Sequence, residues 1–337
     1  MTGSEAYAIQ SEKLFQSYLE ETKIAIDSEL ANLASRFEHL GLYEEIKYVL
    51  ISDGKRLRPT LLALSAQSVG GKWENVKRLA LAIELLHIAS LVHDDILDQD
   101  KFRRNALAVH AKWSVKDAIL VGDALASYSL NLAADYDREI MKIISETGLQ
   151  LCDGEHADVD TTLAKISEKE YLLRIKKKCA SIFMAATQCG AIAGGGTRLE
   201  IEALARFGEN LGLAYQIRDD ISDTTFLGTR IPQDIEQQKT NLPLIHAYES
   251  SSDAEKEELI KNLQTATDNS FTDKRLILNK ILRNLESNGS LSYCYKRIDQ
   301  FIESAVADTK FLKENVFKIQ LVQMANSLRP SQKSMKI

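Results

Sequence analysis

The stretch LALAIELLHIASLVHDDILD, residues 79–98, decides the fold predicted for this chain. Its first part, residues 79–93, is nearly free of charge, so we expect a helix buried among other helices. The stretch ends in two carboxylates one turn apart, Asp94 and Asp98, which share one face of that helix. Like charges at the end of an apolar helix are costly unless a cation compensates them. Hard divalent cations with oxygen ligands are the usual compensation.

A second acidic cluster repeats this arrangement further along the chain. The segment DDISD, residues 219–223, follows the apolar run LGLAYQI, residues 211–217, and Asp219 and Asp223 again lie one turn apart. One such cluster is more often a solvated helix end than a metal site, but two are less easily dismissed. If the two helices face each other, their carboxylates can hold several Mg²⁺ ions. Because Mg²⁺ prefers a few carboxylates together with substrate phosphates, a diphosphate substrate is implied.

The composition favours an all-α protein with one domain. Of the 337 residues, 45% are hydrophobic and 27% are charged, which suits a soluble protein with a large core. None of the four prolines lies between Thr60 and Ile231, so the strongest helix breaker is absent from that stretch. We expect a single domain over residues 1–337, with an N-terminal helix in residues 1–40, the catalytic motifs in residues 54–243 and a flexible tail at residues 328–337.

Hydrophobic periodicity and the glycine, serine and proline positions predict the elements. Helices are expected from about Ala8 to Leu40, Asn75 to Gln99, around Gly122 and Asp123, from Ser167 to the glycines 194–196, and from Leu199 to about Asp223. Ser52 to Lys55 should form a loop, and Pro59 should lie in the first turn of the next helix. A turn-rich segment, residues 224–243, should precede several C-terminal helices.

Charge and cysteine usage exclude several classes of protein. The net charge of −6 argues against a general nucleic-acid or anionic-membrane surface. The four cysteines have no CxxC spacing and form no disulfide-dense frame, so a cytoplasmic location is expected. The N-terminal residues lack the pattern of a signal peptide. The longest apolar stretch, residues 79–92, is too short to span a bilayer and carries Glu84 and His87.

Basic residues accompany both acidic clusters and suggest two diphosphate pockets. The basic groups are Lys55, Arg56 and Arg58, then Arg103 and Arg104, then Lys176, Lys177 and Lys178, and finally Lys239. Arginine makes planar two-point contacts to phosphate, and lysine supplies a point charge. We therefore expect one diphosphate pocket with metal and a second held by arginine and lysine alone.

Taken together, these segments resemble the trans-polyprenyl diphosphate synthase family over most of the chain from about Gly54 to Pro243. The matching segments are GKRLRP (54–59), ELLHIASLVHDDILD (84–98), Arg103 with Arg104, GDALAS (122–127), Tyr171 with Lys178, GLAYQIRDDISD (212–223), Asp234 and KTNLP (239–243). The resemblance implies an all-α bundle of long helices around a central substrate cavity. It also implies a Mg²⁺-dependent prenyltransferase that joins an allylic diphosphate to isopentenyl diphosphate.

The resemblance assigns a role to each matching residue. Asp94, Asp98 and Asp219 resemble direct Mg²⁺ ligands, with Asp95, Asp220 and Asp223 ligating or supporting, for two or three ions per active site. Arg103, Lys178 and Lys239 resemble the groups that grip the allylic diphosphate, and Lys55, Arg58, His87 and Arg104 those that bind isopentenyl diphosphate. Gln216 resembles a residue near the reacting carbons, and Thr240 one beside the developing cation. His87 taken alone would be a core histidine, and its place in the motif reverses that interpretation.

The product length is predicted from two small residues before the first acidic cluster. Ala89 and Ser90 lie five and four positions before Asp94, or roughly 6–7.5 Å along the helix. In the family, an aromatic residue here stops growth at C15, so small residues predict a product of C20 or longer. The primer could be dimethylallyl, geranyl, farnesyl or geranylgeranyl diphosphate. We expect a homodimer, and a heteromer stays open.

Four positions depart from the family pattern, and two other functions stay open. Asn105 and Leu107 replace the usual Gly and Pro after the arginine pair, Cys179 replaces a common Thr, and Gln238 replaces a common Gly. The alternatives are a non-catalytic subunit of a heteromeric prenyl diphosphate synthase and a class I terpene cyclase. Non-catalytic subunits typically lose aspartates, and cyclases usually carry an Asn/Ser/Glu triad as the second motif. A di-iron bundle is disfavoured because no Glu-x-x-His pair occurs.

Overall fold

The computed structural model describes residues 3–159, 162–225, 232–237, 239–267 and 274–329. The predicted tail beyond residue 329, the Gln238 departure and part of the predicted turn-rich segment lie outside the described residues. The described chain divides into two compact units. The first unit comprises residues 1–151, 182–208 and 306–324, and the second comprises residues 152–181, 209–305 and 325–337.

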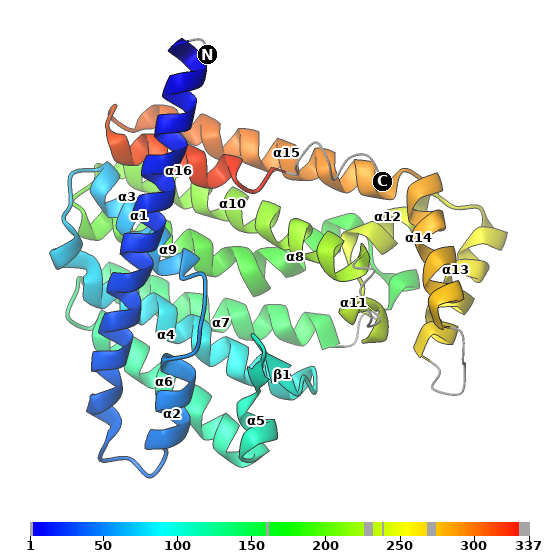
Figure 1. Ribbon diagram of the computed structural model, residues 1–337, viewed down its shortest axis with the longest axis horizontal. Coiled ribbons are helices and arrows are strands. Elements are labelled where there is room, and N and C mark those ends of the chain that lie inside the picture. The colour runs from blue at the N-terminus through cyan, green and yellow to red at the C-terminus, as the bar shows by residue number, and fades with distance from the viewer. Residues whose placement is uncertain (1–2, 160–161, 226–231, 238, 268–273, 330–337) are drawn as a thin grey trace. The chain divides into compact units, whose positions relative to one another are not determined.

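Helices form almost all of the regular structure, which confirms the predicted all-α class (Figure 1). The described residues include two strands, β1 (Phe102–Arg103) and β2 (Ala106–Leu107), which pair as an antiparallel hairpin. Three helices have residues in both units: α7 (Arg138–Val159), α10 (Arg198–Thr225) and α15 (Ser290–Asp308). So does α16 (Val316–Asn326), and α9 (Ser181–Ala193) has its first residue in the second unit and the rest in the first.

The first unit is built around the predicted apolar helix. Its further elements are α1 (Gly3–Ala34), η1 (Ser35–Phe37), α2 (Tyr43–Leu50), α3 (Leu57–Ser68), α4 (Trp73–Leu97), α5 (Val109–Lys112), α6 (Val115–Ala133), α9 (Ser181–Ala193) and η4 (Thr309–Phe311). Helix α4 packs against α3 and α6, and it is buried along most of its length. Gly122 of α6 permits the close packing, because a Cβ there would lie 2.1 Å from His93 Nε2.

The ends of these helices follow the predicted signals in most places. Helix α4 begins two residues before the predicted start and ends two residues before the predicted end. Pro59 lies in the first turn of α3, as predicted, and Gly70 adopts a φ of +101° after that helix. The N-terminal helix ends at Ala34 rather than near Leu40, so that prediction was wrong. The chain turns there because Phe37 is buried against Tyr128 of α6, with ring centroids 4.8 Å apart.

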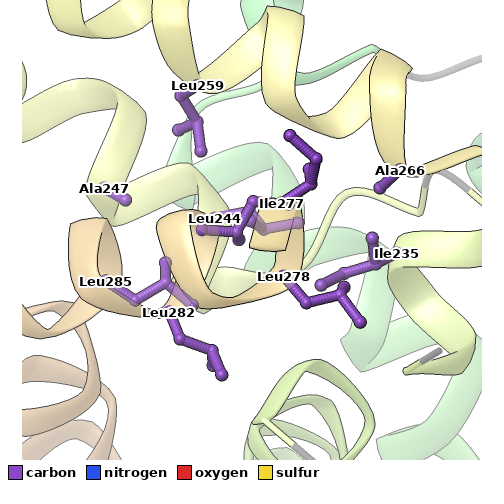
Figure 2. Packing of buried hydrophobic residues seen from close by; sticks show 10 residues of the cluster. Ile235, Leu244, Ala247, Leu259, Ala266, Ile277, Leu278, Leu282 and Leu285 are labelled. Atoms are coloured by element: carbon purple, nitrogen blue, oxygen red, sulfur yellow. The ribbon is translucent and has the colours of Figure 1, made fainter. Parts of the chain in front are cut away.

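The second unit contains shorter helices around its own core. They are η2 (Leu163–Lys165), α8 (Glu168–Ile175), the π-helical turn η3 (Lys176–Ala180), α11 (Gln233–Glu236), α12 (Leu242–Ser250), α13 (Asp253–Thr267) and α14 (Lys274–Ser287). Figure 2 shows Leu244 of α12, Leu259 of α13 and Ile277 of α14 in one apolar cluster. Ser167 caps α8 and forms a capping box with Glu170, which confirms the predicted helix start.

Candidate active site

The first acidic cluster lies at the C-terminal end of α4, and its carboxylates divide between two faces. Asp94 and Asp98 are half-buried, whereas Asp95 is 4% exposed. The division follows from helical geometry, because positions four apart share a face and the adjacent position does not. Burial raises the pKa of the Asp95 carboxyl, and a hydrogen bond from Arg103 counteracts that effect. The carboxylate of Asp95 is therefore buried and hydrogen-bonded. Asp94 and Asp98, on the more exposed face, form what we call the outer pair.

The two adjacent arginines contact different partners. Arg103 lies in β1 and donates from Nε to Asp95 Oδ1 over 2.7 Å. Arg104 occupies the hairpin turn with a φ of 52° and donates to the carbonyl oxygen of Asp53 in the loop before α3. Asn105 follows with a φ of 65°, a left-handed conformation that Asn tolerates better than most residues. The replacement of the family's Gly by Asn105 is thus compatible with the turn.

The predicted isopentenyl diphosphate residues lie around the start of α3. Arg58 Nη1 is 2.9 Å from His87 Nε2, and its guanidinium carbon is 4.6 Å from the centre of the Phe183 ring. Burial, and then the positive charge of Arg58, lower the pKa of His87 well below its ordinary value. A neutral His87 can accept a hydrogen bond from Arg58. Lys55 is exposed on the loop before this group.

The second acidic cluster lies near the C-terminal end of α10 and has the same division. Asp219 is exposed and Asp223 half-buried, whereas Asp220 is 6% exposed. The Tyr171 hydroxyl donates to Asp220 Oδ2 over 2.6 Å, and Gln216 Nε2 donates to Oδ1 over 2.7 Å. Burial, and then the charge of Asp234, raise the pKa of Asp220 to about 7. Neutral donors hold this inward carboxylate, in contrast to the arginine at Asp95.

A charged network in the second unit holds the predicted residues Lys178 and Thr240. Lys178 Nζ lies 2.7 Å from Asp158 Oδ2 and 3.0 Å from Glu155 Oε1. Arg174 Nη1 forms an ion pair with Asp158 Oδ1 at 3.0 Å and donates a hydrogen bond to Thr240 Oγ1 over 2.8 Å. Although burial acts in the opposite direction, Lys178 and Arg174 hold the pKa of Asp158 below its ordinary value. Lys178 and Thr240 thus belong to one continuous network.

The π-helical turn η3 carries Lys178, and a glycine lets α7 approach it. A Cβ at Gly154 would lie 2.4 Å from the Lys178 backbone nitrogen, so any larger residue would displace the turn. Such turns are frequent at functional sites because they change the direction of one side chain in a helix. Cys179 is buried there, with its Sγ 3.9 Å from the carbonyl oxygen of Gly212.

The segment around Lys239 is fixed by buried polar contacts. Asn241 Nδ2 donates to Asp234 Oδ2 over 2.7 Å and to Thr224 Oγ1 over 2.6 Å. The backbone nitrogen of Lys239 donates to the carbonyl oxygen of Asp234 over 2.8 Å. Asn241 also caps α12 through Leu244. These contacts connect Lys239 to the last turn of α10, just beyond the acidic cluster.

The two small residues predicted to control product length lie on α4. Ala89 is buried, and Ser90 is half-buried with its hydroxyl donating to the carbonyl oxygen of His87 over 2.9 Å. Leu86, one turn further from Asp94, keeps 8% of its surface exposed, whereas Ile83 is fully buried.

The carboxylates of each unit supply only part of a Mg²⁺ coordination shell. Among the described residues, no three or more His, Cys, Asp or Glu side chains have an arrangement that could hold a metal ion by themselves. Each unit instead offers an outer pair of carboxylates one turn apart, Asp94 with Asp98 and Asp219 with Asp223. Two hard oxygen donors per helix fit an ion that completes its octahedral shell with phosphate oxygens and water.

Several site residues were missed by sequence reasoning. The structure adds Glu155, Asp158 and Arg174 around Lys178, and Asn241 beside Asp234. The acidic segment CDGEHAD, residues 152–158, could have indicated these contacts, because several carboxylates on one helix are stabilised by nearby cations. Its distance in sequence from Lys178 concealed the connection.

Comparison with known proteins gives a consistent result. The family model described as polyprenyl synthetase matches residues 40–281. The chain is 33% identical over 290 residues to the short chain isoprenyl diphosphate synthase of Methanothermobacter thermautotrophicus, covering 83% of this chain and 87% of the relative. It is 32% identical over 300 residues to the geranylgeranyl diphosphate synthase of Methanosarcina mazei, covering 85% and 88%.

Solved structures agree with these sequence matches. The crystal structure of geranylgeranyl pyrophosphate synthetase from Pyrococcus horikoshii superposes with a TM-score of 0.85 at 28% identity, covering 96% of this chain and all of that one. Within the described part of the chain, no helix combines the length and hydrophobicity that a membrane-spanning segment requires.

Proposed function

The chain belongs to the polyprenyl synthetase family of prenyltransferases, and we propose that it condenses an allylic diphosphate with isopentenyl diphosphate in a Mg²⁺-dependent reaction. The repeated geometry of the two acidic clusters carries this proposal. In each cluster the middle aspartate is buried and hydrogen-bonded, while the first and fifth aspartates occupy the other face. Acidic residues that served only solubility would not require a buried, hydrogen-bonded middle carboxylate in both clusters.

The proposed metal ligands are the outer pairs, Asp94 with Asp98 and Asp219 with Asp223. When bound there, Mg²⁺ supplies charge neutralisation and orientation for the leaving diphosphate. Asp95 and Asp220 support the outer pairs from inside, each through the hydrogen bonds described above. This assignment separates ligating from supporting aspartates, which sequence spacing alone did not do.

Cationic side chains of the second unit hold the allylic diphosphate. Lys178 presents its ammonium group from the π-helical turn, where Asp158 and Glu155 fix its direction. Lys239 of the same unit adds a second charge, and Arg103 is assigned the same role only by its resemblance to the family pattern. Positioned cations of this kind stabilise the negative charge that develops as the carbon–oxygen bond breaks.

The remaining residues act on the carbon skeletons and the second substrate. Lys55, Arg58, Arg104 and neutral His87 bind isopentenyl diphosphate without metal. By resemblance to the family pattern, Gln216 and Thr240 lie near the allylic cation, which the double bond of isopentenyl diphosphate attacks. The proton lost in the last step passes to the released diphosphate, so no side chain is required as a general base.

We further propose a product of C20 or longer, in line with the name of the relative from Methanosarcina mazei and with the small residues Ala89 and Ser90. A homodimer in a reducing, cytoplasmic compartment completes the proposal. The location is supported by four cysteines that are all free thiols.

One assay tests the reaction and its product. Purified protein, Mg²⁺ and labelled isopentenyl diphosphate are incubated separately with dimethylallyl, geranyl, farnesyl and geranylgeranyl diphosphate, and product lengths are measured by chromatography. We expect label in products of C20 or longer. No incorporation with any primer would contradict the prenyltransferase and favour a non-catalytic subunit. Conversion of the primer to a cyclic hydrocarbon without incorporation would favour a cyclase.

A further inference from the structure

Helix α1 carries two charged residues beside its buried stripe. Phe15, Ile26 and Leu30 are fully buried, so this apolar stripe fixes α1 within the first unit. Lys23 and Asp27 flank the stripe and form an i,i+4 ion pair with Nζ 2.9 Å from Oδ2. Neither residue matches a diphosphate-binding motif, and both lie well upstream of the catalytic segments.

This ion pair contacts both ends of the loop that carries Lys55. At one end, Lys23 Nζ lies 3.3 Å from Asp53 Oδ1. At the other end, Asp27 Oδ1 accepts Arg56 Nε over 2.7 Å. Arg56 extends further and donates to Glu84 Oε1 of α4 over 2.8 Å and to the carbonyl oxygen of Ser52 over 2.6 Å. The loop is therefore bound to α1 and to α4 through one guanidinium group.

The loop needs such support because its backbone is strained. Arg56 has a φ of 49°, in the left-handed region that residues with a Cβ rarely adopt. Such a conformation is energetically unfavourable and persists only where the surroundings determine it. Gly54 adds a second constraint, since a Cβ there would lie 2.5 Å from Arg104 Nη1. The strained residue lies between Lys55 and Arg58, and its conformation sets the direction of both.

The two contacts from α1 differ in strength. The side chain of Asp53 is 84% exposed, and an ion pair in that setting contributes little. The side chain of Arg56 is 1% exposed, and loss of a charged partner from a buried guanidinium is much more costly. Asp27 is therefore the important member of the pair, and Lys23 holds the Asp27 carboxylate in place.

From these contacts we propose that Asp27 is a positioning residue for isopentenyl diphosphate: through Arg56 it fixes the loop that presents Lys55 and Arg58. The identity of the ligand rests on the proposed function. The clamp itself, formed by Lys23, Asp27 and Arg56, rests on the contacts alone. The proposal gives the N-terminal helix a part in substrate binding.

Asp27→Asn tests the proposal, because it keeps the acceptor oxygen and removes the charge. Glu29→Gln is the matched control: Glu29 lies on the same helix, pairs with Lys77 and has a side chain 34% exposed, against 35% for Asp27. We expect Asp27→Asn to raise the KM for isopentenyl diphosphate about fivefold, the difference between a charge-assisted and a neutral hydrogen bond. The KM for the allylic substrate and kcat should stay near wild type, and Asp27→Glu should restore most of the loss.

Hydrogen exchange of the amides in residues 52–60 supplies a readout that does not depend on activity. We expect exchange about fivefold faster in Asp27→Asn and unchanged in Glu29→Gln. Equal exchange in both variants overturns the clamp, whatever the kinetics show. An equal rise in both KM values would overturn the specific link to isopentenyl diphosphate. If the wild type fails to consume isopentenyl diphosphate, the proposed function is wrong, and the exchange result still decides the clamp.

Discussion

The two acidic clusters share a spacing but differ in how their middle aspartate is held. In DDILD, residues 94–98, Arg103 donates to Asp95. In DDISD, residues 219–223, Tyr171 and Gln216 donate to Asp220 as neutral groups. In both clusters, helical geometry places the first and fifth aspartates on one face. The buried middle carboxylate is balanced by a charged arginine in the first unit and by neutral hydrogen-bond donors in the second. Sequence spacing determines which carboxylates face outward, and the tertiary surroundings determine what balances the inner one.

The outer aspartates should show the largest effects, and these should be similar in the two clusters. Asp94→Ala and Asp219→Ala should each lower kcat at least about 100-fold, because each removes a ligand that positions charge on the leaving group. EDTA should abolish turnover and added Mg²⁺ should restore it. Steady-state kinetics over a range of Mg²⁺ concentrations provides the measurement. Undiminished turnover in EDTA would refute the metal assignment for both clusters.

The inner aspartates should separate the two clusters. Asp95→Asn removes the hydrogen-bonded ionic partner of Arg103, which keeps only the more distant Asp100 at 3.8 Å, and should lower kcat about tenfold, the size expected for one charge-assisted hydrogen bond. Asp220→Asn can keep neutral contacts, since the Tyr171 hydroxyl accepts as well as donates, so its effect should be only a few-fold. The two substitutions are isosteric and serve as controls for each other. Equal losses in both variants would contradict the difference between ionic and neutral support.

The two arginines of the hairpin should separate the substrates. Arg103 contacts the first acidic cluster, and Arg104 contacts the loop that carries Lys55. Arg103→Ala should therefore mainly raise the KM for the allylic substrate, and Arg104→Ala that for isopentenyl diphosphate. Each lost contact should cost about 1.5–3 kcal/mol, or roughly 10-fold to 150-fold in KM. If both variants affect both substrates equally, the case for two diphosphate pockets fails.

The sequence predicted that Arg103 and Arg104 belong to the site, but it did not predict which partner each of them contacts. The apolar run ending at Asp94 predicted α4 within two residues at each end, because burial and helix periodicity are local properties of the chain. The opposite directions of Arg103 and Arg104 depend on a left-handed turn at Arg104 and Asn105, which no periodicity encodes. The contact of Asp158 with Arg174 likewise joins segments distant in sequence. Local patterns therefore predicted the helices and the motifs, and long-range pairing supplied the partners.

The cation-rich surroundings of the first cluster also predict a pH effect on stability. Burial and the charge of Arg58 lower the pKa of His87 in the folded state below its value near 6.5 in the unfolded state. The unfolded state then binds more protons as the pH falls, so the stability that neutral His87 allows is complete above pH 6.5 and is lost below it. The buried carboxyl of Asp220, whose pKa is raised to about 7, acts in the opposite direction over the same range, so the effect of His87 is measured as a difference between two proteins. We expect the free energy of unfolding of the wild type, relative to that of His87→Gln, to fall by about 1–2 kcal/mol between pH 7 and pH 5. Denaturant unfolding of both proteins provides the measurement, and parallel pH profiles would contradict a buried neutral His87.

The residues one turn before each cluster differ in size, and the last prediction concerns this difference. Ala89 and Ser90 precede Asp94 by five and four positions, whereas Ala214 and Tyr215 precede Asp219 by the same intervals. On the first helix the small pair is followed by Leu86, which keeps some exposure, and then by the fully buried Ile83. If a growing prenyl chain runs past this pair, the two small side chains leave it more room than a residue of the size of Tyr215 would.

Ser90→Phe should therefore shorten the product toward C15 and leave the rate of the first condensation within about twofold, because the metal and diphosphate contacts are untouched. Ser90 is preferable to Ala89 for this test, since Ser90 is half-buried and Phe at the fully enclosed Ala89 risks overpacking. Ser90→Ala removes the hydroxyl without adding volume and should leave the product length unchanged. Chromatography of products from all three proteins with the same primer measures the distribution. A wild type that stops at C15 would mean that a bulky side chain from another helix already closes this path, and a folded Ser90→Phe variant with the wild-type distribution would place the growing chain elsewhere.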